Sequence, residues 1–183
     1  PTVTDPTVAG AKTGEWYKTG VLELTTTASD TGDGATGVTS VEWTTDNPSS
    51  STARWNGLDN RSTNWVGNVN VTDGNVTIYV RARDAAGNIG DTKSVTCKVD
   101  TNAPVIAFTS TTGLMDTTGA SISLPVDLNS YVAKNSFDLK GTIDEPNIKS
   151  VKLEVVKNGV KSEKTFTTGG TGSGAWTYTQ TIA

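Results

Sequence analysis

Histidine is absent from the 183 residues of this chain. Without it the chain cannot build a Ser-His-Asp or Cys-His arrangement, and it lacks the usual ligand of a catalytic zinc ion. Paired carboxylates could in principle replace histidine, as in glycosidases. The adjacent pair Asp144 and Glu145 stands directly before Pro146, where the sequence predicts a turn. We therefore expect no enzymatic activity.

Three other features are scarce. Cys97 is the only cysteine, so an intramolecular disulfide is excluded. No apolar run approaches the roughly 18 residues of a membrane span, so we expect no membrane insertion in this segment. The net charge is −4 and the isoelectric point is about 4.8, which leaves no basic surface for nucleic acid.

The chain is instead rich in threonine, serine, glycine and asparagine, and apolar residues alternate with polar ones. In residues 75–84 every second residue from Val76 to Ala82 is apolar, and polar or aromatic residues stand between them. Such alternation predicts half-buried strands. Turn signals such as Asp33-Gly34 and Asp73-Gly74 separate the strands. Many short strands with closely spaced turns predict an all-β protein built from β-sandwiches.

The second half repeats the pattern of the first. Leu22 and Leu24 match Phe137 and Leu139, residues 40–43 match 150–153, and Trp65 matches Trp176, with offsets of 115, 110 and 111 residues. We therefore predict two tandem units, residues 1–103 and 104–183. Val71 then corresponds to Ile182, and the two strands expected after Val71 have no counterpart in the second unit. The second unit is accordingly expected to lack its last two strands.

Several fragments of the first half resemble bacterial immunoglobulin-like repeats, which occur in tandem on secreted and cell-surface proteins. The resembling fragments, in chain order, are residues 15–20, 37–43, 79–88 and 98–104. The second half resembles the family mainly through its strand pattern and Trp176. The resemblance implies tandem immunoglobulin-like sandwiches in an extracellular protein, with neighbouring repeats of the same chain as partners.

A calcium site is the sharpest hypothesis for a bound ion. Calcium prefers oxygen ligands, and Asp84, Asn88, Asp100 and Asn102 are expected at one end of the sandwich. Residues 100–104 are also similar to the calcium-binding linkers of cadherins, which carry more acidic residues. The alternative is that Asp84 and Asn88 build a turn and Asp100 ends a strand. A second group, Asp30, Asp33 and Gly34, carries the same two interpretations.

Trp16 and Trp55 stand in polar surroundings, whereas Trp43, Trp65 and Trp176 lie on apolar faces and are expected in the core. Exposed aromatic rings can stack on sugars or anchor a protein partner. With Arg54 and Arg61, which lie in the long connection 47–64, the two polar-context tryptophans form a candidate ligand site. The alternative is that they cap the open ends of the sandwich.

Two functions remain open. The chain is either a stalk or spacer of a bacterial surface or secreted protein, or a recognition module that binds a glycan or a host or extracellular-matrix protein. The short boundary that ends at Pro104 favours the spacer, because proline fixes its own φ and biases the preceding residue towards extended conformations. The long connection with Trp55 favours recognition.

Overall fold

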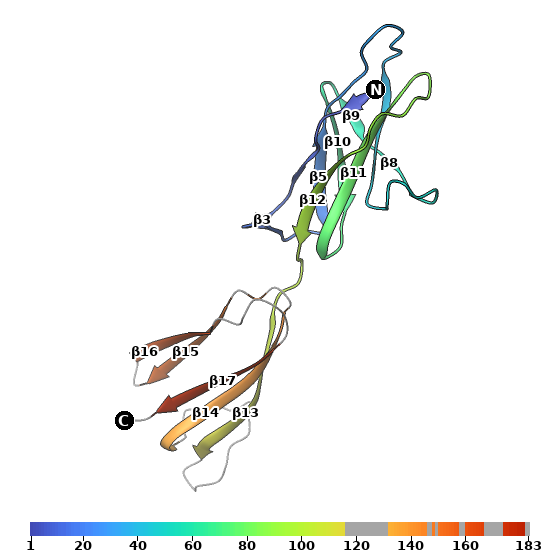
Figure 1. Cartoon of the computed structure of the whole chain (residues 1–183). Helices are drawn as coiled ribbons and strands as arrows, with labels where there is room; N and C mark the ends of the chain where they lie inside the picture. Colours follow the sequence, from blue (N-terminus) through green and yellow to red (C-terminus); the bar gives the residue numbers. More distant parts are fainter. Residues whose placement is uncertain (116–131, 146–147, 149, 158–159, 167–173, 182–183) are drawn as a thin grey trace. The chain divides into compact units, whose positions relative to one another are not determined.

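The computed structural model describes residues 1–115, 132–145, 148, 150–157, 160–166 and 174–181. The chain divides into two compact units, Pro1–Thr101 and Asn102–Ala183 (Figure 1). This division falls between Thr101 and Asn102, slightly before the boundary expected after residue 103. Every element in the described ranges is a strand, so a membrane-crossing helix is absent from this part of the chain. The prediction of an all-β protein is confirmed.

Two sheets form the first unit. Its strands are β1 (Thr2–Val3), β2 (Thr7–Ala9), β3 (Lys12–Thr13), β4 (Trp16–Tyr17), β5 (Val21–Thr26), β6 (Ala28–Ser29), β7 (Val38–Thr44), β8 (Asn56–Gly57), β9 (Asp59–Arg61), β10 (Asn64–Asn70), β11 (Gly74–Asp84) and β12 (Lys93–Val99). The smaller sheet has the order β2-β5-β10-β9, and the larger has the order β3-β4-β12-β11-β7-β8. A short pair, β1-β6, stands beside them. The pairing of β4 with β12 is parallel, and the other pairs in this unit are antiparallel.

The alternation of apolar and polar residues in strand β11 corresponds to its buried and outward faces. Ile78, Val80 and Ala82 are fully buried, whereas the residues between them are only partly covered. Successive side chains of a strand point to opposite faces of the sheet, so the apolar set faces the core and the polar set faces outward. The predicted division of this strand is confirmed.

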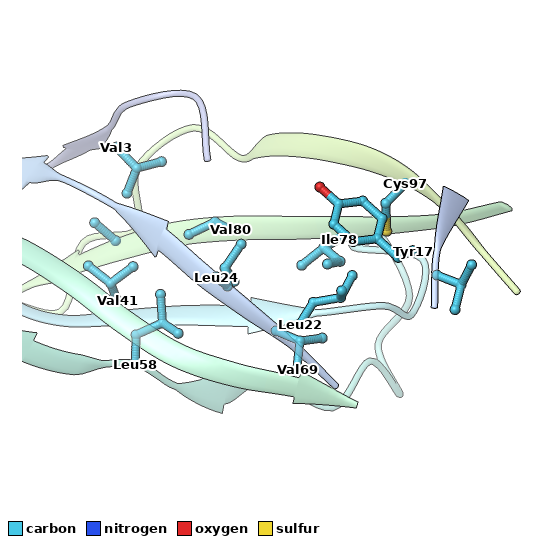
Figure 2. Close-up of a cluster of buried hydrophobic side chains, with 12 residues drawn as sticks. Val3, Tyr17, Leu22, Leu24, Val41, Leu58, Val69, Ile78, Val80 and Cys97 are labelled. Carbon is cyan, nitrogen blue, oxygen red and sulfur yellow. The ribbon is translucent and has the colours of Figure 1, made fainter. Parts of the chain in front are cut away.

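The core lies between the two sheets (Figure 2). Its members are Val3, Tyr17, Leu22, Leu24, Val41, Leu58, Val69, Ile78, Val80, Ala82, Cys97 and Val99. Trp43 and Trp65 pack against this cluster, as predicted. Cys97 is 4% exposed and belongs to this core. Burial raises the pKa of its thiol because the charged thiolate is poorly solvated there.

The first and last strands of this unit engage opposite ends of the sandwich. Strand β1 pairs with β6, which directly follows β5. The pair therefore lies at the end of the sandwich where Thr26 of β5 is opposite Trp65. At the other end of β5, Val21 lies opposite Asn70. The chain leaves the unit at this second end, where Thr101 binds the β10–β11 turn. Figure 1 shows the N-terminus and the departing segment at opposite ends of the first unit.

The second unit contains a three-stranded and a two-stranded sheet in its described residues. The strands are β13 (Val105–Met115), β14 (Val132–Asp144), β15 (Val151–Lys157), β16 (Val160–Phe166) and β17 (Gly174–Thr181). The sheet orders are β13-β14-β17 and β15-β16, with antiparallel pairs throughout. Ile143, Ile148 and Val151 form a buried cluster. Ile182 lies outside the described residues, and the absence of two final strands stays a prediction.

Candidate functional site

Asp84 closes the turn between β11 and β12. Its Oδ1 accepts a hydrogen bond from the backbone N–H of Asn88 at 2.8 Å, and its Oδ2 accepts one from the Asn88 side-chain amide at 2.7 Å. Gly87 completes the turn with a φ of 90°, a conformation that glycine adopts without steric cost. Both oxygens of a carboxylate that is 6% exposed are thus bound to the turn itself. This geometry agrees with the interpretation in which Asp84 and Asn88 build a turn.

These contacts also set the charge state of Asp84. The hydrogen bond from the Asn88 side chain is the largest cause that lowers the pKa of the carboxyl group, because it favours the ionised form. Burial acts in the opposite direction, and backbone hydrogen bonds from Asn88 and Ala86 support the lowering. Asp84 is therefore a charged group stabilised within its own loop.

The expectation that Asp84, Asn88, Asp100 and Asn102 share one end of the sandwich is wrong. In the antiparallel ladder of β11 and β12, Gly74 lies opposite Val99, so Asp100 follows at the start of β11, whereas Asp84 is at its end. Strand β11 is 11 residues long, so its two ends lie roughly 33 Å apart. The four residues therefore do not form a single calcium site.

Asp30 anchors the loop that follows β6. Its Oδ2 accepts hydrogen bonds from the backbone N–H groups of Thr36 and Gly37, at 3.1 and 2.9 Å. Asp33 and Gly34 are exposed in this loop. In the described residues, no group of three or more acidic, histidine or cysteine side chains is placed to hold a metal ion.

Trp55 is part of a stacked cluster on the outer face of the larger sheet. The guanidinium carbon of Arg81 lies 3.7 Å from the centroid of the Trp55 ring, within the range of a cation–π interaction. Glu42 holds this guanidinium in place, because its Oε2 accepts from Nε at 3.0 Å and from Nη2 at 2.9 Å. Arg83 adds a longer ion pair of 3.8 Å to Oε1 of the same carboxylate. One face of the indole is therefore occupied by a protein group.

The two arginines expected beside Trp55 lie elsewhere or make other contacts. Arg54 is exposed, and its backbone N–H donates to Oδ2 of Asp46 at 2.8 Å, which closes the loop after β7. Arg61 is exposed at the end of β9, in the smaller sheet. The structure thus supplies Arg81 as the cationic partner of Trp55, instead of Arg54 or Arg61.

Trp16 is separate from this cluster. It is half-buried on β4, and three strands of the larger sheet stand between β4 and β8, the strand that follows Trp55. At the usual spacing, β4 and β8 lie roughly 19 Å apart. The Lys98 ammonium lies 5.9 Å from the Trp16 ring centroid and 2.6 Å from Oε2 of Glu15. The predicted set of Trp16, Trp55, Arg54 and Arg61 is not brought together, and the Trp176 side chain lies outside the described residues.

Two contacts of the structure were not predicted from the sequence. The first is the stack of Arg81 on Trp55, for which the outward position of Arg81 in β11 was the available signal. The second is Asp73, whose Oδ1 accepts from both the N–H and the hydroxyl of Thr101 at 2.9 Å. The backbone N–H of Asp100 also donates to the carbonyl of Tyr17 at 2.9 Å. These bonds fix the segment that leaves the first unit.

Comparison of the chain with protein-family models, curated proteins and solved structures finds no match.

Proposed function

We propose that this chain is a non-catalytic, extracellular segment of tandem immunoglobulin-like repeats that serves as a stalk or spacer of a bacterial surface or secreted protein. The extracellular bacterial setting rests on the resemblance of residues 15–20, 37–43, 79–88 and 98–104 to such repeats.

The strand order of the first unit supports the immunoglobulin-like assignment. Strands β2, β5, β10 and β9 stand in the order A-B-E-D of an immunoglobulin sheet, and β12, β11 and β7 in the order G-F-C of its partner. The sequential hairpin β11–β12 and the return of β10 to β5 are the connections of a Greek key. The parallel pair of β4 with β12 adds a strand from the N-terminal part of the unit to the larger sheet.

The strand register of the second unit supports the repeat. In the first unit, Leu24 lies opposite Gly67 and Thr26 opposite Trp65. Adding 115 to the first member and 111 to the second gives Leu139 with Tyr178 and Gly141 with Trp176, and these positions are paired in the second unit. The third offset, 110 residues, matches Val41 with Val151, and both valines are buried.

The observation that carries the spacer role is the placement of the unit's first and last segments. The chain meets the first unit at the β1–β6 end and leaves at the Asp73 end, so tension along the chain acts along the length of the sandwich. The hydrogen bonds of the antiparallel β2–β5 pair are perpendicular to the strands, and those of the parallel β4–β12 pair are slanted. A force along the strands therefore shears the bonds of each pair together instead of breaking them one at a time.

Single-molecule force spectroscopy on the full chain tests this role. Tethered at its two ends, the chain should release the first unit in one step of roughly 300 Å, the extension expected of about 101 residues less the folded length. The matched control carries Asp33→Cys and Ala86→Cys and is pulled through these two positions, which lie in neighbouring loops at one end of the unit. Cys97 is buried and should not compete for attachment.

Pulling through the two loops separates strands successively, so we expect a lower unfolding force than in the end-to-end geometry. An end-to-end force equal to or below that of the control would contradict a load-bearing spacer.

A further inference from the structure

A shallow cavity lies beside the β10–β11 turn. It has a volume of about 290 Å³, just below the usual range of small-molecule sites. We infer that it is a binding site for a single sugar residue, a small neutral ligand with many hydroxyl groups. The inference goes beyond the spacer role and does not depend on it.

The polar lining of the cavity is uncharged. Its polar residues are three threonines and two asparagines: Thr45, Asn70, Thr72, Asn75 and Thr77. The Thr77 hydroxyl is also hydrogen-bonded to the Thr96 hydroxyl, at 3.0 Å. Hydroxyls and amides both donate and accept hydrogen bonds, which is what the hydroxyl groups of a sugar require. Ions would find no opposite charge here, so the lining selects a neutral ligand.

The acidic residues next to this lining in the sequence are engaged elsewhere. Asp46, which follows Thr45, accepts from the Arg54 backbone. Asp73, which follows Thr72, accepts from Thr101. Neither carboxylate is among the groups that line the cavity.

The two apolar residues of the lining are fixed by their surroundings. Val71 and Val76 line the cavity and pack against the buried core. The backbone N–H of Val71 donates to the carbonyl of Gly20, the residue before β5, at 2.9 Å. Lining residues that are ordered before binding lower the entropic cost of binding a ligand.

Strand β11 adds an open backbone edge. On one side, residues 74–80 pair with β12. On the other side, β7 pairs only from Tyr79 onward, and no described strand continues that pairing along residues 74–78. Backbone groups on this stretch can therefore supply further hydrogen bonds to a ligand.

The test is a titration of the full chain, labelled with ¹⁵N, with methyl glycosides of glucose, galactose, mannose and N-acetylglucosamine. Both anomers are used, because a methyl glycoside mimics a sugar linked within a glycan, and the free sugars form a parallel arm. We expect at least one probe to shift the amide signals of Thr45 and residues 70–77, with a Kd on the order of millimolar. Binding of the glycoside but not the free sugar would identify a linked residue as the ligand.

Asn70→Ala should weaken binding roughly threefold to tenfold, the usual effect of one lost neutral hydrogen bond. The matched control is Asn68→Ala, an exposed asparagine on the same strand that does not line the cavity. Three results would overturn the inference: no sugar shifts these signals, both variants bind equally, or the short peptide acetyl-Thr-Val-Thr-amide binds along residues 74–78 in place of every sugar.

Discussion

In the smaller sheet of the first unit and the three-stranded sheet of the second, the strands that the proposed repeat matches are paired in one register, yet with different residues. Gly67 stands opposite Leu24 in the first unit, and Tyr178 stands opposite Leu139 in the second. A slip of one residue would move every side chain to the other face of the sheet, so register is specified by the alternating pattern as a whole. The alternation of apolar and polar residues can therefore keep a register while the residues paired across the strands change.

The other sheets of the two units, the six-stranded sheet of the first and β15-β16 of the second, differ more. In the first unit, β7 has β11 on one side and β8 on the other. In the described residues of the second unit, β15 pairs with β16 alone. Two ion pairs join this hairpin, Lys152 to Glu163 and Lys161 to Glu154, at 2.6 and 2.9 Å. Exposed pairs of this kind contribute little stability, so the hairpin depends on the buried cluster that includes Val151.

The largest expected effect comes from the core of the first unit. Leu24→Ala removes a fully buried side chain and should lower the free energy of unfolding of that unit by about 2–5 kcal/mol. Urea unfolding of the full chain should show one transition shifted and the other unchanged. Val21→Ala, on the same strand at a position 47% exposed, is the control and should have little effect. A shift of both transitions by Leu24→Ala would mean that the units do not unfold separately.

A matched pair of valines compares the two units directly. Val41→Ala and Val151→Ala each remove two methyl groups, from side chains that are 0% and 5% exposed. If the two positions are equivalent, each variant should lower the stability of its own unit by about 2 kcal/mol. Circular dichroism during denaturation measures both. If Val41→Ala strongly lowered the free energy of unfolding and Val151→Ala left it nearly unchanged, the two positions would not be equivalent.

A smaller effect is expected at the segment that leaves the first unit. Asp73→Ala removes the acceptor of both hydrogen bonds from Thr101, and the loss should cost about 1 kcal/mol. The Thr101 amide should also exchange faster with solvent, which hydrogen exchange followed by NMR detects. Asp59→Ala, an exposed residue of β9, serves as the control. Unchanged exchange at Thr101 would show that Asp73 does not hold this segment.

The Trp55 stack should contribute less. A double-mutant cycle with Trp55→Ala and Arg81→Ala should give a coupling of about 0.5–1 kcal/mol. The same cycle on Trp16 and Lys98, where the cation lies 5.9 Å from the ring centroid, should give less. Equal couplings would mean that the shorter distance at Trp55 brings no additional attraction.

The last prediction concerns pH. The pKa of Asp84 is lowered in the folded state, so the stability that its charge contributes is present above the unfolded value of about 3.9 and is lost as pH falls through the folded value. Asp84→Asn should therefore flatten the fall in stability of the first unit below about pH 4. Asp91→Asn, just beyond the same turn, is the control. An unchanged acid profile in Asp84→Asn would contradict this role.

Some features of the fold could be predicted from the sequence and others could not, as particular residues show. The alternation in β11 identified its buried face, and the apolar context of Trp43 and Trp65 placed both against the core, because these features depend on local pattern. The joint calcium site failed because the end of the sandwich at which Asp100 lies depends on strand direction, which the pairing of β12 with β11 decides. For the Trp55–Arg81 stack, the alternation showed that Arg81 faces outward, but which residue covers it depends on how a long loop folds back over the sheet, and residue spacing does not determine that.

The central claim is that the two units are repeats of one strand register, and cross-strand NOEs in the second unit test it most directly. In an antiparallel sheet, directly opposed residues bring their backbone protons close together. The account predicts NOEs that pair Leu139 with Tyr178 and Gly141 with Trp176, matching Leu24 with Gly67 and Thr26 with Trp65 in the first unit. A ladder displaced by one or more residues in the second unit, with the first unit as described, would contradict it.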